Sequence, residues 1–197
     1  MPQEKFFPNP SHVDSIPWSS DLAPVVSTEH YPTWILSSEH RYYGYLRLLI
    51  EEFEPSSVVE LGTFQGISAL FMKSALPVFS KLTTIDIHPV DNLLTQILKL
   101  DTRVRLVSGD TRDPDIVKEF GIDQVDFLYI DTDHNFRQIA AEWDVWRPVL
   151  ANGAIVVLDD IHLNPEMEFF WNQIPFVKLD TGKILHHSGF GLFQYHQ

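Results

Sequence analysis

The fold of this chain is decided by the stretch Val58-Val59-Glu60-Leu61-Gly62-Thr63-Phe64-Gln65-Gly66-Ile67-Ser68. An apolar run ends in an acidic residue, a turn with two glycines follows at once, and an apolar helix comes next. A strand that feeds a helix through so tight a loop is the unit that binds nucleotide-like cofactors in open α/β sheets. The stretch therefore predicts an α/β fold with a cofactor site, although it does not identify the cofactor.

The rest of the chain repeats this alternation of strands and helices. Strands are predicted at 58–61, 82–87, 104–107, 125–130 and 154–158, helices at 34–53, 67–75, 91–100, 114–120, 136–150 and 165–173, and two terminal strands at 176–179 and 190–195. This order predicts a doubly wound, Rossmann-like sheet that is mostly parallel and ends in a C-terminal antiparallel hairpin. Residues 34–197 then form a single domain, and the proline-rich residues 1–33 form an irregular arm or lid.

Composition limits the classes of function. The 197 residues fit one domain, and a hydrophobic share of 44% is enough for a core without disulfides. The chain has no cysteine, which excludes thiol nucleophiles and zinc–thiolate sites and fits a cytoplasmic protein. A net charge of −13 disfavours nucleic acids and anionic membrane surfaces as partners. No apolar run is long enough to cross a bilayer, and residues 1–10 do not resemble a secretion signal.

Carboxylates follow every predicted parallel strand. In doubly wound sheets, ligands bind at the carboxyl ends of the strands. Crowded like charges are costly unless a cation or hydrogen-bond donors compensate them, so their clustering indicates a binding site. The residues are Glu60, Asp86, Asp110, Asp131 and the pair Asp159 and Asp160.

The carboxyl ends of the first two predicted strands are suited to an adenosine-type cofactor. Asp86 closes the second strand, where a carboxylate can accept hydrogen bonds from both hydroxyls of a ribose. The structural alternative for Asp86 is a cap on the helix that follows. Gly62 and Gly66 allow the backbone to approach the ligand closely. Ser68, in the first turn of the helix, offers a hydroxyl and free N–H groups to a carboxylate.

The carboxyl ends of the fourth and fifth predicted strands are suited to a metal ion. Asp131, Asp159 and Asp160 lie together if the fourth and fifth strands are neighbours, and three carboxylates form a hard site for Mg²⁺, Mn²⁺ or Ca²⁺. The alternative for the adjacent pair is to cap a loop. His134 could remove a proton from a substrate hydroxyl bound beside the metal, although a single histidine is more often a core or solvent-facing residue.

Together these residues resemble the class I S-adenosylmethionine-dependent methyltransferases, over about residues 34–197. The small metal-dependent catechol O-methyltransferase type shares Glu60-Leu61-Gly62, Gly66, Ser68, Asp86 and the three aspartates. The segments Ile130-Asp131-Thr132-Asp133-His134 and Leu158-Asp159-Asp160 look even more like the macrolide-sugar O-methyltransferases. That branch usually has glycine where this chain has Thr132.

The resemblance implies a role for each of these residues. Glu60, Gly62 and Ser68 would hold the methionine part of S-adenosylmethionine, Asp86 the ribose, and Asp110 or Thr111 would lie near the adenine. Thr63, Phe64, Gly66 and Asp131 complete the implied cofactor site. Asp131, Asp159 and Asp160 would bind Mg²⁺, or Mn²⁺ or Ca²⁺ in its place. His134 stands where catechol-type enzymes have a lysine base, as in the sugar-modifying branch.

The implied function is metal-dependent methyl transfer from S-adenosylmethionine to a hydroxyl of a small molecule, such as a sugar, a phenol or another natural product. N-methylation of a small molecule is an alternative. Related small enzymes often form homodimers, although the sequence itself does not decide the oligomeric state. A nicotinamide dehydrogenase would use the glycine loop and Asp86 but not the three aspartates. A metal-dependent hydrolase would use the three aspartates but not the glycine loop and Asp86. A non-catalytic cofactor-binding or scaffold protein also stays open, because a fold does not fix a function.

Overall fold

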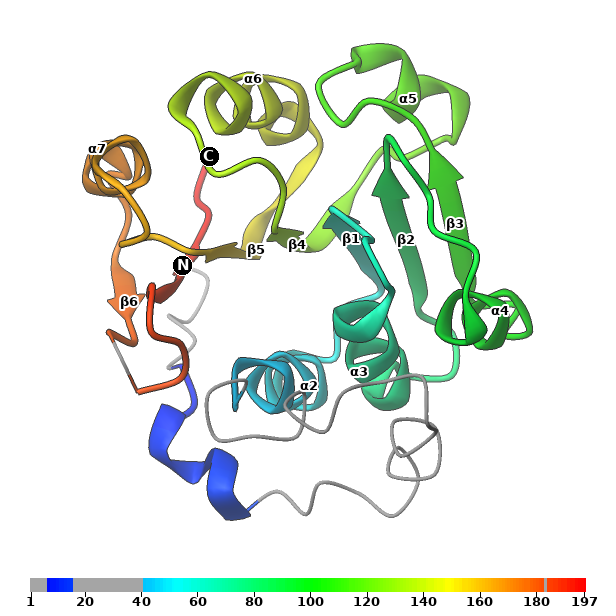
Figure 1. The fold of residues 1–197 in the computed structure, drawn as a ribbon, viewed down its shortest axis with the longest axis horizontal. Helices are drawn as coiled ribbons and strands as arrows, with labels where there is room; N and C mark the ends of the chain where they lie inside the picture. The colour runs from blue at the N-terminus through cyan, green and yellow to red at the C-terminus, as the bar shows by residue number, and fades with distance from the viewer. Residues whose placement is uncertain (1–6, 16–40, 183) are drawn as a thin grey trace.

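The structure, a computed structural model, describes residues 7–15, 41–182 and 184–197, which form a seven-stranded sheet between two layers of helices (Figure 1). The strands are β1 (Ser57–Leu61), β2 (Lys81–Asp86), β3 (Val104–Ser108), β4 (Val125–Ile130), β5 (Leu150–Asp159), β6 (Lys178–Asp180) and β7 (Phe190–Gln194). The α-helices are α2 (Arg41–Phe53), α3 (Ile67–Ala75), α4 (Leu93–Lys99), α5 (Pro114–Glu119), α6 (Phe136–Trp146) and α7 (Pro165–Gln173). Two 3-10 helices are η1 (Pro10–Ser15) and η4 (Arg147–Val149).

The strand order in the sheet is β3-β2-β1-β4-β5-β7-β6. The strands β1 to β5 are parallel, whereas β7 runs antiparallel to both of its neighbours, β5 and β6. The order of the strands reverses between β1 and β4, because β2 and β3 lie on one side of β1 whereas β4 and β5 lie on the other. Open α/β sheets bind ligands at such a switch point. The predicted fold class and the terminal antiparallel hairpin are confirmed.

The predicted helix 136–150 is too long, and the predicted fifth strand begins too late. The helix α6 ends at Trp146, because Pro148 lacks an N–H group and its ring excludes a continuing α-helix. After the short turn η4, β5 begins at Leu150, four residues before the predicted start at 154. β5 ends at Asp159, at the edge where the other parallel strands end.

The sheet is buried on both faces. Phe127 and Tyr129 of β4 pack with the helices α2, α3 and α4, and their neighbours Leu128 and Ile130 pack with α5, α6 and α7. Because alternate side chains of a strand point to opposite faces, a doubly covered strand is apolar throughout. That is why the predicted strands appear as continuous apolar runs.

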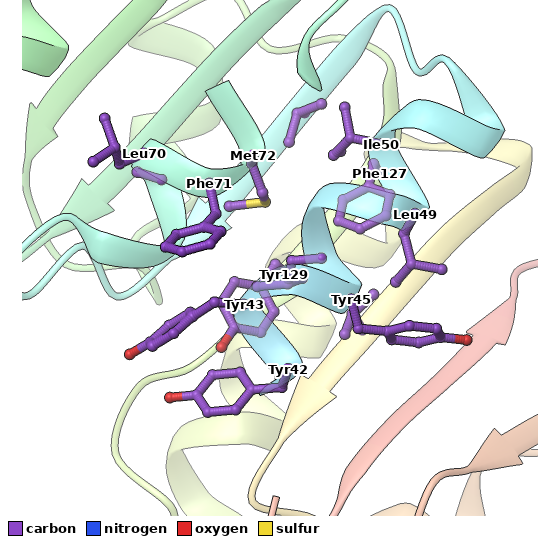
Figure 2. Packing of buried hydrophobic residues seen from close by; sticks show 14 of the residues in the cluster. Tyr42, Tyr43, Tyr45, Leu49, Ile50, Leu70, Phe71, Met72, Phe127 and Tyr129 are labelled. Atoms are coloured by element: carbon purple, nitrogen blue, oxygen red, sulfur yellow. The ribbon is translucent and has the colours of Figure 1, made fainter. Parts of the chain in front are cut away.

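The helices α2 and α3 pack against each other over the first face through aromatic side chains (Figure 2). Tyr43 of α2 stacks on Phe71 of α3 with ring centroids 5.6 Å apart. The Tyr45 hydroxyl donates a hydrogen bond to the Pro8 carbonyl at 2.6 Å, and this bond ties the segment 7–15 to α2. The remainder of the predicted arm 1–33, and with it the question of a lid, lies outside the described residues.

No helix in the described ranges combines the length and the apolar character that crossing a membrane requires.

Candidate functional site

A cavity of about 590 Å³ opens at the carboxyl ends of β1 to β4, at the switch point of the sheet. Its size is within the range of pockets that bind cofactors and other small molecules. Six of the predicted cofactor residues line it, namely Gly62, Phe64, Asp86, Asp110, Thr111 and Asp131. The other four, Glu60, Thr63, Gly66 and Ser68, lie outside this lining.

The loop after β1 is pressed against the end of β4. Gly62 has a φ of +97°, and a Cβ atom at this position would lie 1.9 Å from the carbonyl oxygen of Asp131. Its N–H group donates to the Ile85 carbonyl at 2.8 Å. Only glycine fits such an approach, because it alone combines this backbone conformation with the absence of a side chain. The first glycine of the loop therefore brings the ends of β1, β2 and β4 together around the cavity.

Asp86 faces the cavity from the end of β2. Its carboxylate accepts hydrogen bonds from the backbone N–H groups of Phe64, at 2.7 Å, and His88, at 2.8 Å. It does not cap the next helix, because the N-cap of α4 is Asn92. The two backbone donors fix the carboxylate in place at the cavity wall.

Glu60 lies behind the loop. Its carboxylate is fully buried and accepts hydrogen bonds from the hydroxyls of Ser68 and Thr84, and Thr84 in turn shares a hydrogen bond with Thr63. The pKa of Glu60 is raised to about 8, first by burial and then by the nearby carboxylates of Asp131 and Asp86, against the lowering effect of the two hydroxyl donors. These hydrogen bonds fix the loop to β2 and α3. At Gly66, the start of α3 packs closely against α4.

The two candidates for adenine contact differ in their surroundings. Asp110 forms an ion pair with Arg112 at 2.6 Å, and the hydrogen bond from this guanidinium lowers the pKa of Asp110. Thr111 is buried, and its hydroxyl donates to the carboxylate of Glu142. Both residues line the cavity.

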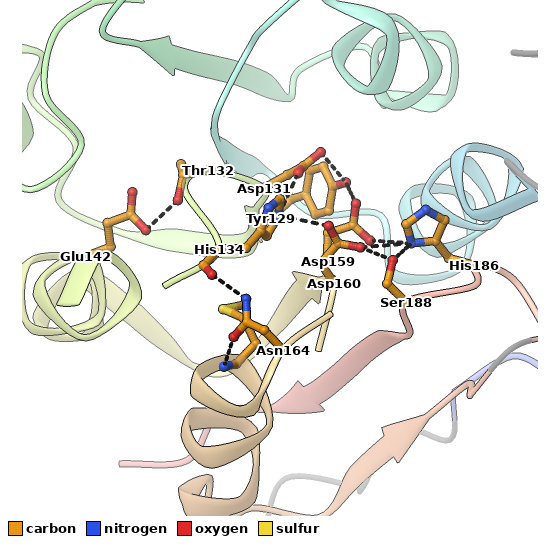
Figure 3. Close-up of polar contacts among 11 residues, drawn as sticks. Tyr129, Asp131, Thr132, His134, Glu142, Asp159, Asp160, Asn164, His186 and Ser188 are labelled. Carbon is orange, nitrogen blue, oxygen red and sulfur yellow. Dashed lines mark hydrogen bonds and ion pairs between the residues drawn. The ribbon is translucent and has the colours of Figure 1, made fainter. Parts of the chain in front are cut away.

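Glu142 is a site residue that the sequence analysis missed. Its buried carboxylate on α6 accepts hydrogen bonds from Thr111 after β3 and from Gln138 at 2.8 Å. It also accepts one from Thr132 after β4 at 2.9 Å (Figure 3). It thus joins two strand-end loops that line the cavity. The available signal was the spacing of Gln138 and Glu142 on one helix face with Trp146, but a solvated acidic residue on α6 would look the same.

The three predicted metal aspartates come together next to the cavity. Because β4 and β5 pair in parallel with Ile130 opposite Leu158, Asp131, just after β4, and Asp159, the last residue of β5, lie at the same level of the sheet. The Tyr129 hydroxyl lies between them, 3.0 Å from Asp131 Oδ2 and 3.5 Å from Asp159 Oδ2 (Figure 3). Asp131 therefore belongs both to the cavity lining and to the carboxylate cluster.

His134 lies over this cluster. Its Nε2 atom is 3.4 Å from Asp131 Oδ1 and 3.3 Å from Asp160 Oδ2, which are ion-pair distances. This nitrogen is buried and has no hydrogen-bond partner among the described residues. Burial lowers the pKa of His134, but the surrounding carboxylates of Asp131 and Asp160 outweigh burial, so that the pKa of the imidazole is raised.

His186 is the second site residue that the sequence analysis missed. Its Nδ1 atom lies 3.2 Å from Asp160 Oδ1 and 3.5 Å from Asp159 Oδ1. The signal was indirect, since β7 had to be paired with β5 in the correct antiparallel register. That register places Phe190 opposite Asp159, so the residues just before β7 cross the end of β5.

These side chains fit a divalent cation. Asp159 is 3% exposed, and its Oδ1 atom lacks a hydrogen-bond partner in the part of the chain that the structure describes. Burial raises the pKa of Asp159 well above its ordinary value, and the charges of Asp131 and Asp160 raise it further. A buried carboxylate without a donor is costly unless a cation compensates it. Asp159, Asp160 and His186 each offer one ligand atom, and these atoms lie within 4.8 Å of one another.

The fold is that of the Rossmann-like methyltransferases of class I. The chain matches the model of the methyltransferase domain family over residues 59–161, slightly more than half of its length. It belongs to this family.

Curated relatives are similar over part of their length. The chain is 33% identical over 89 residues to catechol O-methyltransferase from Mus musculus, an alignment that covers 42% of this chain and 34% of that protein. It is 28% identical over 149 residues to rhamnosyl O-methyltransferase from Mycobacterium leprae, covering 67% and 61%. The chain thus spans between about a third and three fifths of the length of these relatives.

Solved structures share the fold. A methyltransferase from Geobacter sulfurreducens matches with a TM-score of 0.70 at 19% identity, covering 95% of this chain and 94% of that chain. The O-methyltransferase TomG from Streptomyces achromogenes, in complex with S-adenosylmethionine, matches with a TM-score of 0.65 at 18% identity, covering 90% and 95%.

Proposed function

We propose that this protein transfers a methyl group from S-adenosylmethionine to a hydroxyl of a small molecule, with the help of a divalent cation. One observation carries the proposal, namely that the cavity at the switch point and the carboxylate cluster meet at Asp131. A cofactor in the cavity and a cation in the cluster would therefore be neighbours. Neither a dehydrogenase nor a hydrolase needs both features side by side.

The cavity residues suit the parts of S-adenosylmethionine. The fixed carboxylate of Asp86 would accept hydrogen bonds from the ribose hydroxyls. The loop of Gly62 to Gly66 would hold the methionine part. The hydrogen-bonded side chains of Glu60, Thr63 and Ser68 keep this loop in place. Asp110 and Thr111 would lie at the adenine. The relative from Streptomyces achromogenes, which binds this cofactor according to its description, supports the assignment.

The chemistry divides between the bound groups and the chain. The sulfonium of S-adenosylmethionine supplies an electrophilic methyl group, and a divalent cation held by Asp131, Asp159 and Asp160 would supply Lewis-acid activation of the acceptor hydroxyl. His134 would take the hydroxyl proton at Nε2, the nitrogen that faces the cluster. The loops would hold the acceptor oxygen in line with the methyl carbon, which removes the entropic part of the barrier.

The acceptor is proposed only as a class. A sugar hydroxyl, a phenol or another natural-product hydroxyl fits the proposal, and the named relatives act on a catechol and on a rhamnosyl group according to their descriptions. N-methylation of a small molecule is the alternative for the acceptor. A homodimer is the expected assembly, and sedimentation velocity would test it.

Calorimetry and a methyl-transfer assay test the proposal together. S-adenosylmethionine should bind, whereas NAD should not. Formation of S-adenosylhomocysteine in the presence of a panel of catechols, rhamnosides and amines should require a hydroxyl acceptor, stop with EDTA and resume with excess Mg²⁺ or Mn²⁺. Binding of NAD alone would contradict the proposed cofactor. Binding of S-adenosylmethionine without transfer to any acceptor of the panel would favour a cofactor-binding scaffold.

A further inference from the structure

Residues 184–189, just before β7, close the carboxylate cluster from one side. Two backbone hydrogen bonds hold this segment across the end of β5, from Ile161 N–H to the Gly189 carbonyl at 3.3 Å and from His162 N–H to the Ser188 carbonyl at 2.7 Å. The approach is close, since a Cβ atom on Gly189 would lie 2.5 Å from Cδ2 of His162. These contacts with Ile161 and His162 therefore set the position of this segment relative to Asp159 and Asp160.

His186 is held by this segment with one ring nitrogen toward the carboxylates (Figure 3). The residue is 8% exposed, and its ring packs on that of Tyr42 from α2 at a centroid distance of 4.7 Å. Its Nδ1 atom faces Asp160 Oδ1 at 3.2 Å and Asp159 Oδ1 at 3.5 Å. The ring is thus oriented before any ion binds.

Ser188 orients the carboxylate that His186 faces. Its hydroxyl donates to Asp160 Oδ1 and lies 3.2 Å from Nδ1 of His186. Asp160 itself has a φ of +57°, a conformation that residues other than glycine seldom adopt. Side-chain and backbone geometry together hold Asp160 toward the histidine, while the buried Oδ1 atom of Asp159 has no hydrogen-bond donor among the described residues.

We propose that His186 is a protein ligand of the cation through Nδ1, and that this nitrogen donor makes the centre prefer first-row transition ions over Mg²⁺ and Ca²⁺. The inference rests on the proposed metal dependence and specifies the ion. Carboxylates alone suit Mg²⁺, Ca²⁺ and Mn²⁺, whereas an imidazole favours the later divalent ions, whose affinities rise from Mn²⁺ through Fe²⁺ to Co²⁺ and beyond. A site with carboxylates and one imidazole should therefore bind Co²⁺ and Mn²⁺ more tightly than Mg²⁺.

The competing explanation is that His186 is only a positive partner for Asp159 and Asp160. An imidazolium that neutralises these carboxylates would compete with every cation. Its removal would then strengthen the binding of Mg²⁺, Mn²⁺ and Co²⁺ alike. A ligand behaves in the opposite way, because its removal weakens binding, most of all for the ions that favour nitrogen.

The decisive measurements use the full chain without methyl donor or acceptor. Titration calorimetry with CoCl₂, MnCl₂ and MgCl₂ would compare the unaltered protein with His186→Asn and with the matched control His187→Asn. His187 is the exposed neighbour, and no ion pair joins it to either carboxylate within the described ranges. We expect His186→Asn to lose about tenfold or more in Co²⁺ affinity and much less in Mg²⁺ affinity. The control should keep both affinities.

Pulsed electron paramagnetic resonance of bound Mn²⁺ tests the ligand directly. His134 is the other imidazole at the cluster, so the measurement is made in the His134→Ala background. A ¹⁴N coupling should persist in His134→Ala and disappear in the double variant His134→Ala, His186→Asn. The first of these readings remains informative even if the double variant fails to fold.

Three results would overturn the inference: no ¹⁴N coupling in His134→Ala, an equal loss of Co²⁺ and Mg²⁺ affinity in His186→Asn, or a gain in the affinity for both. These readings are independent of catalysis. Metal-dependent methyl transfer by a protein that lacks the ¹⁴N coupling would leave the proposed function intact and remove only the role of His186. Tight Co²⁺ binding without methyl transfer would leave the role of His186 intact and contradict the proposed function.

Discussion

At the scale of single residues, His134 has the most direct proposed role in turnover. Its Nε2 atom faces Asp131 and Asp160 without a hydrogen-bond partner among the described residues. We expect His134→Ala to lower kcat by about 10²-fold or more, the usual contribution of a positioned base, while calorimetry still detects S-adenosylmethionine binding. The exposed His187 offers a control, and His187→Ala should retain its rate. Unchanged turnover in His134→Ala would exclude the proposed role.

A second residue, Glu60, should make stability depend on pH. Its pKa is raised to about 8 in the folded protein from an ordinary value of 4.5, mainly through burial. A raised pKa favours the protonated folded state, so this contribution is complete below the ordinary pKa and is lost as the pH rises through about 8. Between pH 5 and pH 8.5 the loss should be on the order of 1–4 kcal/mol.

Glu60→Gln tests this expectation, because the amide is neutral at every pH and its oxygen can still accept a hydroxyl proton. Urea unfolding at a series of pH values should show a shallower fall in the free energy of unfolding than in the unaltered protein. The exposed Glu119 gives the matched control Glu119→Gln, which should leave the slope as it was. Equal slopes in all three proteins would show that Glu60 is ionised throughout.

At the scale of the elements, the loop between β1 and α3 depends on its contact with the end of β4. Gly62→Ala would place a methyl group 1.9 Å from the Asp131 carbonyl oxygen and displace the loop from the cavity. Gly121 is a suitable comparison, because it also has a positive φ but has nothing within 4 Å of an added Cβ atom. Both substitutions carry a backbone cost of about 1–2 kcal/mol.

The clash should cost Gly62→Ala a further 1–3 kcal/mol or so in unfolding free energy. It should also abolish S-adenosylmethionine binding in calorimetry, whereas Gly121→Ala should bind normally. Equal affinities in the two variants would mean that the loop does not form the cofactor site.

The helix α6 contributes through Glu142, which connects the loops after β3 and β4. Glu142→Gln replaces one acceptor oxygen by an amide donor, so the bonds on that side must reverse, as the hydroxyls of Thr111 and Thr132 can, or be lost, as the bond from the Gln138 amide must be. We expect S-adenosylmethionine affinity to fall about fivefold to tenfold, the equivalent of one hydrogen bond. Glu119→Gln on α5 again serves as the control. A change in kcat at unchanged affinity would point instead to a role in the chemical step.

At the scale of the whole molecule, the carboxylate cluster that would bind a cation lowers the stability of the metal-free protein. Asp159 is buried beside two like charges, and its Oδ1 atom has no donor within the described ranges. Asp159→Asn should therefore stabilise the metal-free protein by about 1–3 kcal/mol. That gain corresponds to an increase in Tm of roughly 2–12 °C for a chain of this size.

The same variant should lose its response to divalent cations. In the unaltered protein, a cation at a hundred times its Kd should add about 2.7 kcal/mol of stability, whereas in Asp159→Asn it should add little. Differential scanning calorimetry with and without MnCl₂ measures both effects. A destabilised metal-free variant would contradict the assumption that the charge of Asp159 is costly.

The fold could be predicted almost completely from the sequence, because each parallel strand is a continuous apolar run followed by a helical period. The exceptions are local, such as the early end of α6 before Pro148. The predicted aspartates and His134 also meet as expected, since strand ends in a parallel sheet share one edge. Their chemical roles remain predictions.

Glu142 and His186 were missed for a physical reason. Neither follows a parallel strand, so neither is marked by the pattern that identified the aspartates. Glu142 reaches the site through the rotation of α6, and His186 through the antiparallel register of β7 with β5. Tertiary packing decides both positions, and local sequence carries little information about it.

The placement of β7 between β5 and β6 has a consequence for how the protein is made. During synthesis β6 leaves the ribosome before β7, yet β7 is its one partner strand among the described residues. Until β7 arrives, β5 exposes an apolar edge, which is open to aggregation. His186 and Ser188 lie on one side of that seam, and Asp159 and Asp160 on the other. An ion bound by residues on both sides of the seam would hold β7 against β5. Slower hydrogen exchange at the β7 amides would then show that β7 has taken its place in the sheet.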